Sequence, residues 1–395
     1  MELDGMTTGD TVDTARLVRD TVALVRIDSQ NPGVGEEACA RWTHGRLRNA
    51  GIEVTTRQAS PGRDNVVARV AGRGDGPRLV LLAHLDTVPI GEGWTVPPLK
   101  GLIRNGRVYG RGAADMKAGL AVAISLLEDL ASGEPPRGDV VLCATVDEEG
   151  PDMAGAHALV ADGLVGLGDQ VLALEPTGLR LRIAQVGLRW LELTVHGRMA
   201  HAGRAHLGID ANHVVARVVD RLKERIAGLP YRDELLGCPL FTCGVLAGGV
   251  ATNVVPPSSR AQLDIRLVPP MTTDDALTLA RAVVEETLVD FPGATYDLCG
   301  LGVARPPVRA ADDAYVVARL RDAYADVVGR AIASGGGDGH EAYTDASMVA
   351  ALTGSRSCTV FGPGSSDQAH TADEFVAVRD IEVASRVLRT MVARW

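Results

Sequence analysis

Side chains of the kinds that bind metals stand at the ends of three strand-like, largely apolar runs of the chain, at 78–83, 139–146 and 170–174. These side chains, together with one acid that opens a helical segment, are His84, Asp86, Asp147, Glu148, Glu149, Glu175 and Asp115. A single acid in such a place means little, because Asp and Glu often begin loops or cap helices. So many acids in one place would repel one another unless cations neutralised them. Imidazole and carboxylate groups together, without cysteine, suit Zn²⁺, Co²⁺ or Mn²⁺.

The elements that must position these side chains are predicted from the spacing of apolar residues. The three runs are apolar along their length, as strands buried on both faces should be. Helical spacing indicates helices at 11–27, 36–50 and 115–132, and the alternation of strand and helix resumes over 311–395, with a last helix near 378–394. Buried strands that alternate with helices predict an α/β domain with a mainly parallel sheet. In such a sheet, sites gather at the carboxyl ends of the strands.

The pattern changes near Gly187, where strands with alternating polarity begin. Strand and helix signals then follow in the order β-α-β-β-α-β, at 188–197, 209–227, 241–247, 259–268, 273–289 and 294–301. This order is typical of ferredoxin-like domains. About 120 residues are enough to fold as an inserted domain. We therefore expect one domain from residues 1–187 and 308–395, and an inserted domain from residues 188–307.

Composition and charge argue against several classes of protein. The formal net charge is −10 and no basic stripe is present, so we expect no nucleic-acid partner. No apolar run approaches 18 residues and the first residues lack a signal peptide, so we expect no membrane span and a cytoplasmic location. The six cysteines are scattered without CxxC spacing, which favours buried, reduced thiols over disulfides.

Seven motifs, in order along nearly the whole chain, give the sequence its resemblance to metallopeptidase family M20. They are HLDTVP (84–89), RVYGRGAADMKAG (107–119), TVDEEG (145–150), EPT (175–177), AHAGRAHLGIDA (200–211), GGVATNVVPPSSRAQLDIRLVP (248–269) and FGPGSSDQAHTADEFV (361–376). Each motif alone is moderately specific, but their shared order is very specific. The resemblance implies a catalytic metallohydrolase domain at 1–187 and 308–395, interrupted by a ferredoxin-like lid or dimerisation domain at 188–307.

The resemblance also implies a centre with two divalent metal ions, for which zinc is expected and cobalt or manganese is possible. His84 and Glu175 would hold one ion, Glu149 and His370 the other, and Asp115 would bridge both. The Asp115–Met116 peptide bond would be cis.

Two further residues of this domain take roles from the resemblance. Asp86 would orient His84 by accepting its second N–H. Glu148 would be the general base that takes a proton from the attacking water.

Three residues of the inserted domain match substrate contacts of the family. His201 would polarise the scissile carbonyl, often across a dimer interface, and the alternative is a solvated loop histidine. Asn253 and Arg266 would bind substrate, although Arg266 could instead form an ion pair with Asp264. His206 matches no family role.

The acidic loop around Asp338, His340 and Glu341 departs from the family pattern. It would suit a cationic substrate group, and a solvated loop is an equally open interpretation.

The predicted activity is that of an amidohydrolase that removes an acyl group from an N-acyl amino acid, nearest to the acetylornithine deacetylase and succinyl-diaminopimelate desuccinylase group. The alternative within the family is a di- or carboxypeptidase that acts on a short peptide. A non-catalytic relative should have lost a metal ligand or the base, and all six are present. We also expect a homodimer, for which the apolar face of the helix at 209–227 is available unless it packs on its own sheet.

Overall fold

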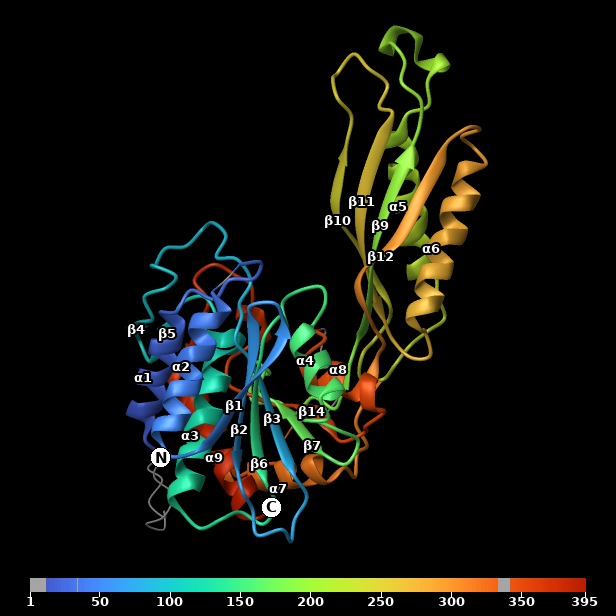
Figure 1. Ribbon diagram of the computed structural model, residues 1–395. Helices are drawn as coiled ribbons and strands as arrows, with labels where there is room; N and C mark the ends of the chain where they lie inside the picture. The colour runs from blue at the N-terminus through green and yellow to red at the C-terminus, as the bar shows by residue number, and fades with distance from the viewer. Residues whose placement is uncertain (1–11, 34, 333–341) are drawn as a thin grey trace. The chain divides into compact units, whose positions relative to one another are not determined.

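The computed structural model describes residues 12–33, 35–332 and 342–395, and these residues form two compact units (Figure 1). Unit 1 contains the described residues up to Ile183, from Arg309 to residue 332, and from Thr344 to Trp395. Unit 2 contains Ala184–Val308 together with Ala342 and Tyr343.

Unit 1 is built on a six-stranded sheet that contains both parallel and antiparallel strands. The strands follow in the order β1 (Glu53–Ser60), β2 (Arg63–Val70), β6 (Val140–Thr145), β3 (Leu79–His84), β7 (Gln170–Ala173) and β14 (Cys358–Val360). Strands β6, β3, β7 and β14 run parallel, whereas β1 and β2 form an antiparallel edge. Every residue of β3 and β6 is buried, as their apolar composition predicts.

Helices cover both faces of this sheet (Figure 1). One face carries α2 (Glu36–Asn49), α3 (Ala118–Ser132), α7 (Tyr315–Val328) and α9 (Val378–Ala393), and α1 (Thr14–Val25) packs on α3 and α9. The other face carries α4 (Ala154–Ala161) and α8 (Asp345–Thr353). The predicted α/β class is therefore confirmed.

The segment before α3 is irregular, so the helix predicted from residue 115 begins later. Ala113–Lys117 forms a π-type turn in which Asp115 and Met116 have non-helical backbone angles, and the Asp115–Met116 peptide bond is cis. A small antiparallel sheet consists of β4 (Leu102–Arg104), β5 (Arg107–Tyr109) and β15 (Phe375–Ala377), and β15 contacts this turn. Strand β15 thereby brings the segment after His370 beside the segment before Asp115.

Unit 2 has the predicted β-α-β-β-α-β order. It consists of β9 (Gly187–His196), α5 (Ala211–Ala227), β10 (Leu240–Gly248), β11 (Ser258–Leu267), α6 (Thr273–Leu288) and β12 (Thr295–Arg305). The strands form an antiparallel sheet in the order β10-β11-β9-β12, the ferredoxin-like arrangement. The short strands β8 (Ala184–Gln185) and β13 (Val308–Arg309) pair where the chain enters and leaves this unit.

The apolar face of α5 is used inside unit 2. Val214, Val215, Val218 and Leu222 are completely buried in a core that includes Leu193 of β9. The suggestion that this face forms a dimer contact was therefore wrong, because the sheet of the same unit already covers it. Among the described residues, no helix combines the length and apolarity that crossing a membrane requires.

Candidate metal centre

The carboxyl ends of three adjacent parallel strands bring the candidate ligands of unit 1 together. His84 is the last residue of β3, Glu149 lies in the turn after β6, and Glu175 lies two residues beyond β7. Asp115 joins them from the π-type turn, and His370 from the loop after the short helix at Ser366–Gln368. Because β3 pairs with both β6 and β7, their ends meet at one edge of the sheet.

The donor atoms of these residues form two overlapping groups. In the first, His84 Nε2 lies 3.0 Å from Asp115 Oδ1 and 3.7 Å from Glu175 Oε2. In the second, His370 Nε2 lies 3.1 Å from Glu149 Oε1 and 3.4 Å from Asp115 Oδ2. Within each group the donor atoms lie within 4.8 Å of one another. Asp115 thus turns one oxygen toward each group, as a carboxylate that bridges two cations must.

Burial dominates the electrostatics of three glutamates, whereas the histidines beside Asp115 lower the pKa of that carboxyl. Burial raises the pKa of Glu148 well above its usual range, raises that of Glu149, and raises that of Glu175 to about 7. The acids also repel one another, and Asp345 at the start of α8 adds to the repulsion on Glu148 and Glu175. Buried acids that hold protons so tightly need a compensating positive charge to remain ionised together.

The two histidines supply part of that charge when no cation is present. Burial disfavours a charged His84, but Glu175 and Asp115 outweigh it and raise the pKa of His84 well above its usual value. Hydrogen bonds to Asp115 and Glu149 raise the pKa of His370 to about 10. A metal ion would displace these protons, because only neutral imidazole can coordinate.

Asp86 contacts both His84 and the turn that carries Glu148. The Nδ1 atom of His84 lies 3.0 Å from the main-chain carbonyl oxygen of Asp86, and 3.5 Å from its carboxylate. The carboxylate also accepts hydrogen bonds from the main-chain N–H groups of Glu148 (3.3 Å) and Glu149 (3.1 Å), and from Asn31 Nδ2 (2.8 Å). The carbonyl therefore orients His84, while the carboxylate holds the turn that carries Glu148.

A second set of buried contacts holds the same turn from Asp147, whose φ of 65° is in the left-handed region. Its carboxylate accepts hydrogen bonds from Arg63 Nη1 (2.7 Å) and Asn31 Nδ2 (3.1 Å), and its N–H donates to Glu36 Oε1 (2.8 Å). Arg63 also forms an ion pair with Glu36. Sequence reasoning missed Asn31, Glu36 and Arg63, because they lie in distant segments and no motif marks them.

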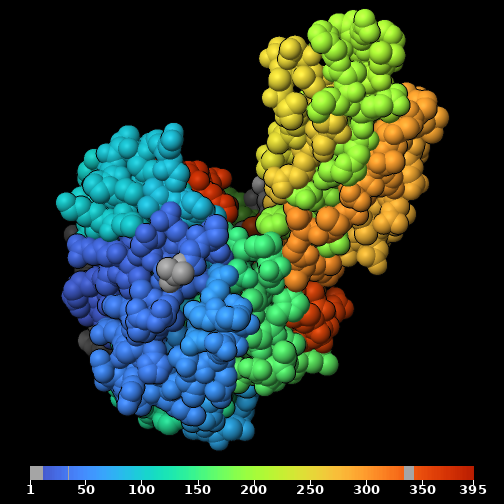
Figure 2. All heavy atoms as spheres, turned by 45° about the horizontal axis from the view of Figure 1, so that its top comes forward, coloured from blue at the N-terminus to red at the C-terminus, as the bar shows by residue number. Residues whose placement is uncertain are grey.

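The candidate substrate residues of unit 2 lie on two neighbouring loops. His201 is exposed, its Nδ1 accepts a hydrogen bond from the N–H of Gly203 at 3.0 Å, and its main chain forms a bridge with Val254. The carbonyl of Asn253, also exposed, accepts a hydrogen bond from the N–H of Ala202 at 3.0 Å. The space-filling view shows the two loop regions (green and yellow) side by side at one end of unit 2 (Figure 2).

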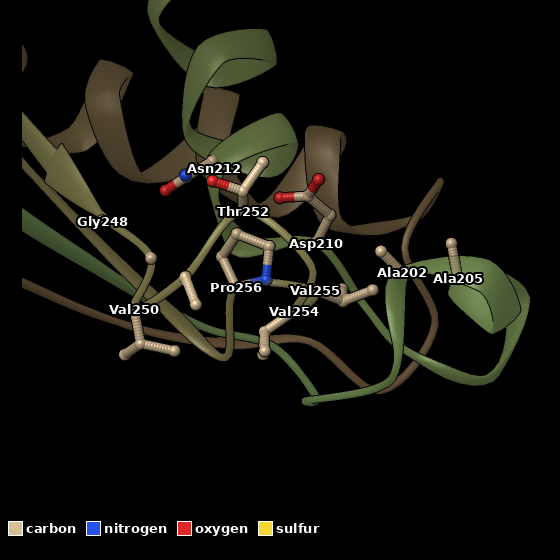
Figure 3. Close-up of a pocket in the computed structure, with 12 residues that line it drawn as sticks. Ala202, Ala205, Asp210, Asn212, Gly248, Val250, Thr252, Val254, Val255 and Pro256 are labelled. Carbon is tan, nitrogen blue, oxygen red and sulfur yellow. The ribbon is translucent and has the colours of Figure 1, made fainter.

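A pocket of about 560 Å³ lies between these loops and the start of α5. In the view of Figure 3, the Thr252 side chain lies between those of Asn212 and Asp210, and Val254 lies below them. The pocket lies within unit 2 and combines small apolar side chains with a few polar groups.

Arg266 lies on β11 and pairs with Asp264. Its Nε and Nη2 atoms each lie 2.9 Å from a carboxylate oxygen of Asp264, which also accepts a hydrogen bond from Trp190 Nε1 at 3.1 Å. Arg266 therefore forms the ion pair with Asp264 that is the alternative to a role in substrate binding. Asp338, His340 and Glu341 of the acidic loop lie outside the described residues.

Comparison with known proteins identifies the family. The sequence profile of peptidase family M20/M25/M40 matches residues 80–394. The chain belongs to this family. It is similar to the succinyl-diaminopimelate desuccinylase of Rhodospirillum centenum, with 31% identity over 355 residues that cover 84% of each chain.

Solved structures of M20 peptidases share the fold. A tripeptidase from Staphylococcus aureus has a TM-score of 0.80 at 22% identity, covering 97% of this chain and 100% of the tripeptidase. A dinuclear metal-binding peptidase from Bacillus subtilis has a TM-score of 0.69 at 15% identity, covering 96% of this chain and 98% of that one. As an M20 family member, the chain is an enzyme that acts on amide bonds, and its centre takes two metal ions.

Proposed function

We propose that this M20 enzyme removes an acyl group from an N-acyl amino acid by metal-dependent hydrolysis, and that N-succinyl amino acids are its first candidate substrates. The observation that carries the proposal is the pair of donor groups that share Asp115, with Glu148 in the turn that also carries Glu149. The similarity to a named desuccinylase over 84% of the chain supports the choice of acyl group.

The residues of the centre fit two divalent cations. His84, Asp115 and Glu175 would hold one ion, and Asp115, Glu149 and His370 the other. Two imidazoles and three carboxylates match the donors that Zn²⁺ prefers in catalytic sites, so we propose zinc. The buried acids fit as well, because divalent charge would offset the burial, and the added repulsion, that raise the pKa values of Glu148, Glu149 and Glu175. When bound, the ions would polarise the scissile carbonyl and acidify the attacking water.

Glu148 is proposed as the general base. It would accept a proton from the attacking water and later donate one to the leaving amine. Its position is supported by the hydrogen bond from its N–H to Asp86 and by the contacts of Asp147 next to it. These contacts would keep the base in place while Glu149 binds metal.

His201 is proposed to stabilise the carbonyl oxygen of the substrate, with Asn253 as a neighbouring substrate contact. Their exposure on two adjoining loops supports a role in which they meet a ligand. For Arg266 the ion pair with Asp264 supports a structural role, and carboxylate binding is the second interpretation.

A homodimer is the proposed assembly, and a cytoplasmic location is proposed with it. Strand β10 lies at the edge of its sheet and exposes Leu240, Val245 and Leu246, which makes it a better candidate for an interface than α5. All six cysteines are free, which supports a reducing compartment. Light scattering of the purified enzyme tests the dimer.

The activity is tested by a hydrolysis screen on protein stripped of metal and then supplied with Zn²⁺, Co²⁺ or Mn²⁺. The panel contains N-succinyl and N-acetyl amino acids, dipeptides and tripeptides, and the Glu148→Ala variant serves as the control for contaminating peptidases. We expect the highest kcat/KM on an N-succinyl or N-acetyl amino acid. Higher kcat/KM on peptides would replace this proposal with a peptidase of the same family.

A further inference from the structure

Glu374 is completely buried, and both of its carboxylate oxygens bind the loop that leads to Asp115. Oε1 accepts hydrogen bonds from the N–H groups of Ala114 (2.8 Å) and Asp115 (3.1 Å). Oε2 accepts hydrogen bonds from the N–H of Gly112 (3.0 Å) and from Arg111 Nη1 (2.7 Å). Four donors, one of them charged, therefore satisfy a carboxylate that would be costly to bury alone.

Arg111 extends these contacts to the other side of the centre. It is only 3% exposed, and its Nη1 also donates to the main-chain carbonyl of Thr371 at 3.1 Å. Thr371 directly follows His370. The main chain adds a further tie, because the carbonyl of Glu374 accepts a hydrogen bond from the N–H of Gly110 at 2.9 Å. The loops that carry Asp115 and His370 are thus joined through Glu374 and Arg111.

The two donor groups of the centre depend on these ties to different degrees. His84 ends a strand inside the sheet, and its side chain is 1% exposed. His370 lies in a loop with a φ of 62°, and its side chain is 53% exposed. Asp115 has backbone angles that no regular element maintains, so its N–H has no helical acceptor and takes Glu374 instead. In the second group, two of the three ligands therefore lie on loops that Glu374 and Arg111 hold.

We propose that Glu374 is a positioning residue for the metal position formed by Asp115, Glu149 and His370. It acts by fixing the main chain of the Asp115 loop and, through Arg111, the loop of His370. The proposal rests on the two-metal centre proposed above. The position formed by His84, Asp115 and Glu175 depends on Glu374 less, because His84 and Glu175 follow strands of the sheet.

The test measures Zn²⁺ binding to metal-stripped protein by competition with a chromophoric chelator. Glu374→Gln keeps the size of the side chain and removes its charge and one acceptor. We expect it to raise the Kd of one of the two ions by about 10–100-fold, the usual effect of losing a group that orients a ligand, and that of the other by less than about 3-fold. The retained ion should behave like the one retained in His370→Ala, which defines the affected position.

Asp169→Asn is the matched control. Asp169 is also buried, pairs with Arg78 through two 2.6 Å contacts and accepts the N–H of Gly166, but it lies at the opposite end of β7 from Glu175. The Asp169→Asn protein should bind both ions as the wild type does. Equal loss of both ions in Glu374→Gln, or no loss, would overturn the proposal, as would the same selective loss in Asp169→Asn.

If circular dichroism shows that Glu374→Gln does not fold, Arg111→Gln serves as a second test of the same proposal. It leaves the carboxylate with its main-chain donors and removes the tie to Thr371, so it should weaken the same ion. A folded Arg111→Gln protein with wild-type binding of both ions would contradict the proposal. Wild-type protein that binds fewer than two ions would instead overturn the two-metal centre itself.

Discussion

The metal centre of unit 1 and the loops of unit 2 that carry His201 and Asn253 differ in how their side chains are held. His84 and Glu175 are 1% and 5% exposed, and their neighbours Asp86 and Asp147 are hydrogen-bonded to residues from distant segments. His201 and Asn253 are exposed, and the contacts between their loops run through the main chain.

This difference indicates two ways of preparing a site. In unit 1 the fold pre-orients the acids, and the repulsion between them favours binding of cations. In unit 2 the loops are positioned by their backbones, while the side chains stay available for a ligand. Mutations in unit 1 should therefore affect metal binding or chemistry, and those in unit 2 should affect substrate turnover without changing metal content.

The largest expected effect is that of Glu148→Ala. Loss of the base should lower kcat by at least about 10³-fold, within the range typical of general bases, while both metals stay bound because Glu149 and the other ligands remain. Steady-state kinetics and metal analysis by plasma spectrometry check this. Activity near that of the wild type with full metal content would contradict the assignment of Glu148.

His201→Ala should have the next largest effect. Loss of a group that stabilises the developing oxyanion should lower kcat by about 10²–10³-fold with unchanged metal content. His206→Ala is the control, because His206 lies on the same short helical loop and has no proposed role. Equal kinetic effects of the two variants would show that His201 only maintains the structure of its loop and does not act on the substrate.

Removal of the metal ions should make the free energy of unfolding depend on pH. The pKa of Glu175 is raised from 4.5 to about 7, so folded metal-free protein holds this proton more tightly than the unfolded chain. Its contribution to stability is therefore complete below about pH 4.5 and is lost as the pH rises through about 7. The slope from this group is at most about 1.4 kcal/mol per pH unit.

Urea unfolding between pH 5 and 8 with and without chelator measures this effect. Metal-free protein should lose stability as the pH rises, and metal-bound protein should not, because ligands bind metal better when deprotonated. Metal-free Glu175→Gln should show a shallower slope. A metal-free protein whose stability rises with pH over this range would contradict the effect expected from Glu175.

The smallest effect is expected for Arg266→Lys. Since Arg266 pairs with Asp264, loss of its planar guanidinium group should lower the free energy of unfolding by about 1 kcal/mol or less and leave KM nearly unchanged. Kinetics on a substrate and its carboxamide analogue, with thermal unfolding, check this. A sharp rise in KM for the acid alone would restore the role of Arg266 in carboxylate recognition.

The long, periodic elements and the strand-end ligands could be predicted from the sequence, but the short or irregular segments could not. The strands β4, β5 and β15 have three residues each, too few to show a period. The helix predicted from residue 115 begins at Ala118, because Asp115 and Met116 have non-helical backbone angles. The apolar face of α5 was visible in the sequence, but its partner was not, since one stripe can pack on a sheet or on a second chain.

The sequence by itself determined the α/β class and the order of elements in unit 2, which depend on local periodicity. Its resemblance to family M20 indicated which residues could hold metal. Only the tertiary structure decided that the carboxylate of Asp86 holds the Glu148 turn, that Arg63 and Glu36 support it, and that Glu374 holds the Asp115 loop. Glu374 and Gly112 are 262 positions apart in the chain, so no local pattern can pair them. Their contact arises because the pairing of β15 with β5 brings the two segments together, and Glu374 is buried between them.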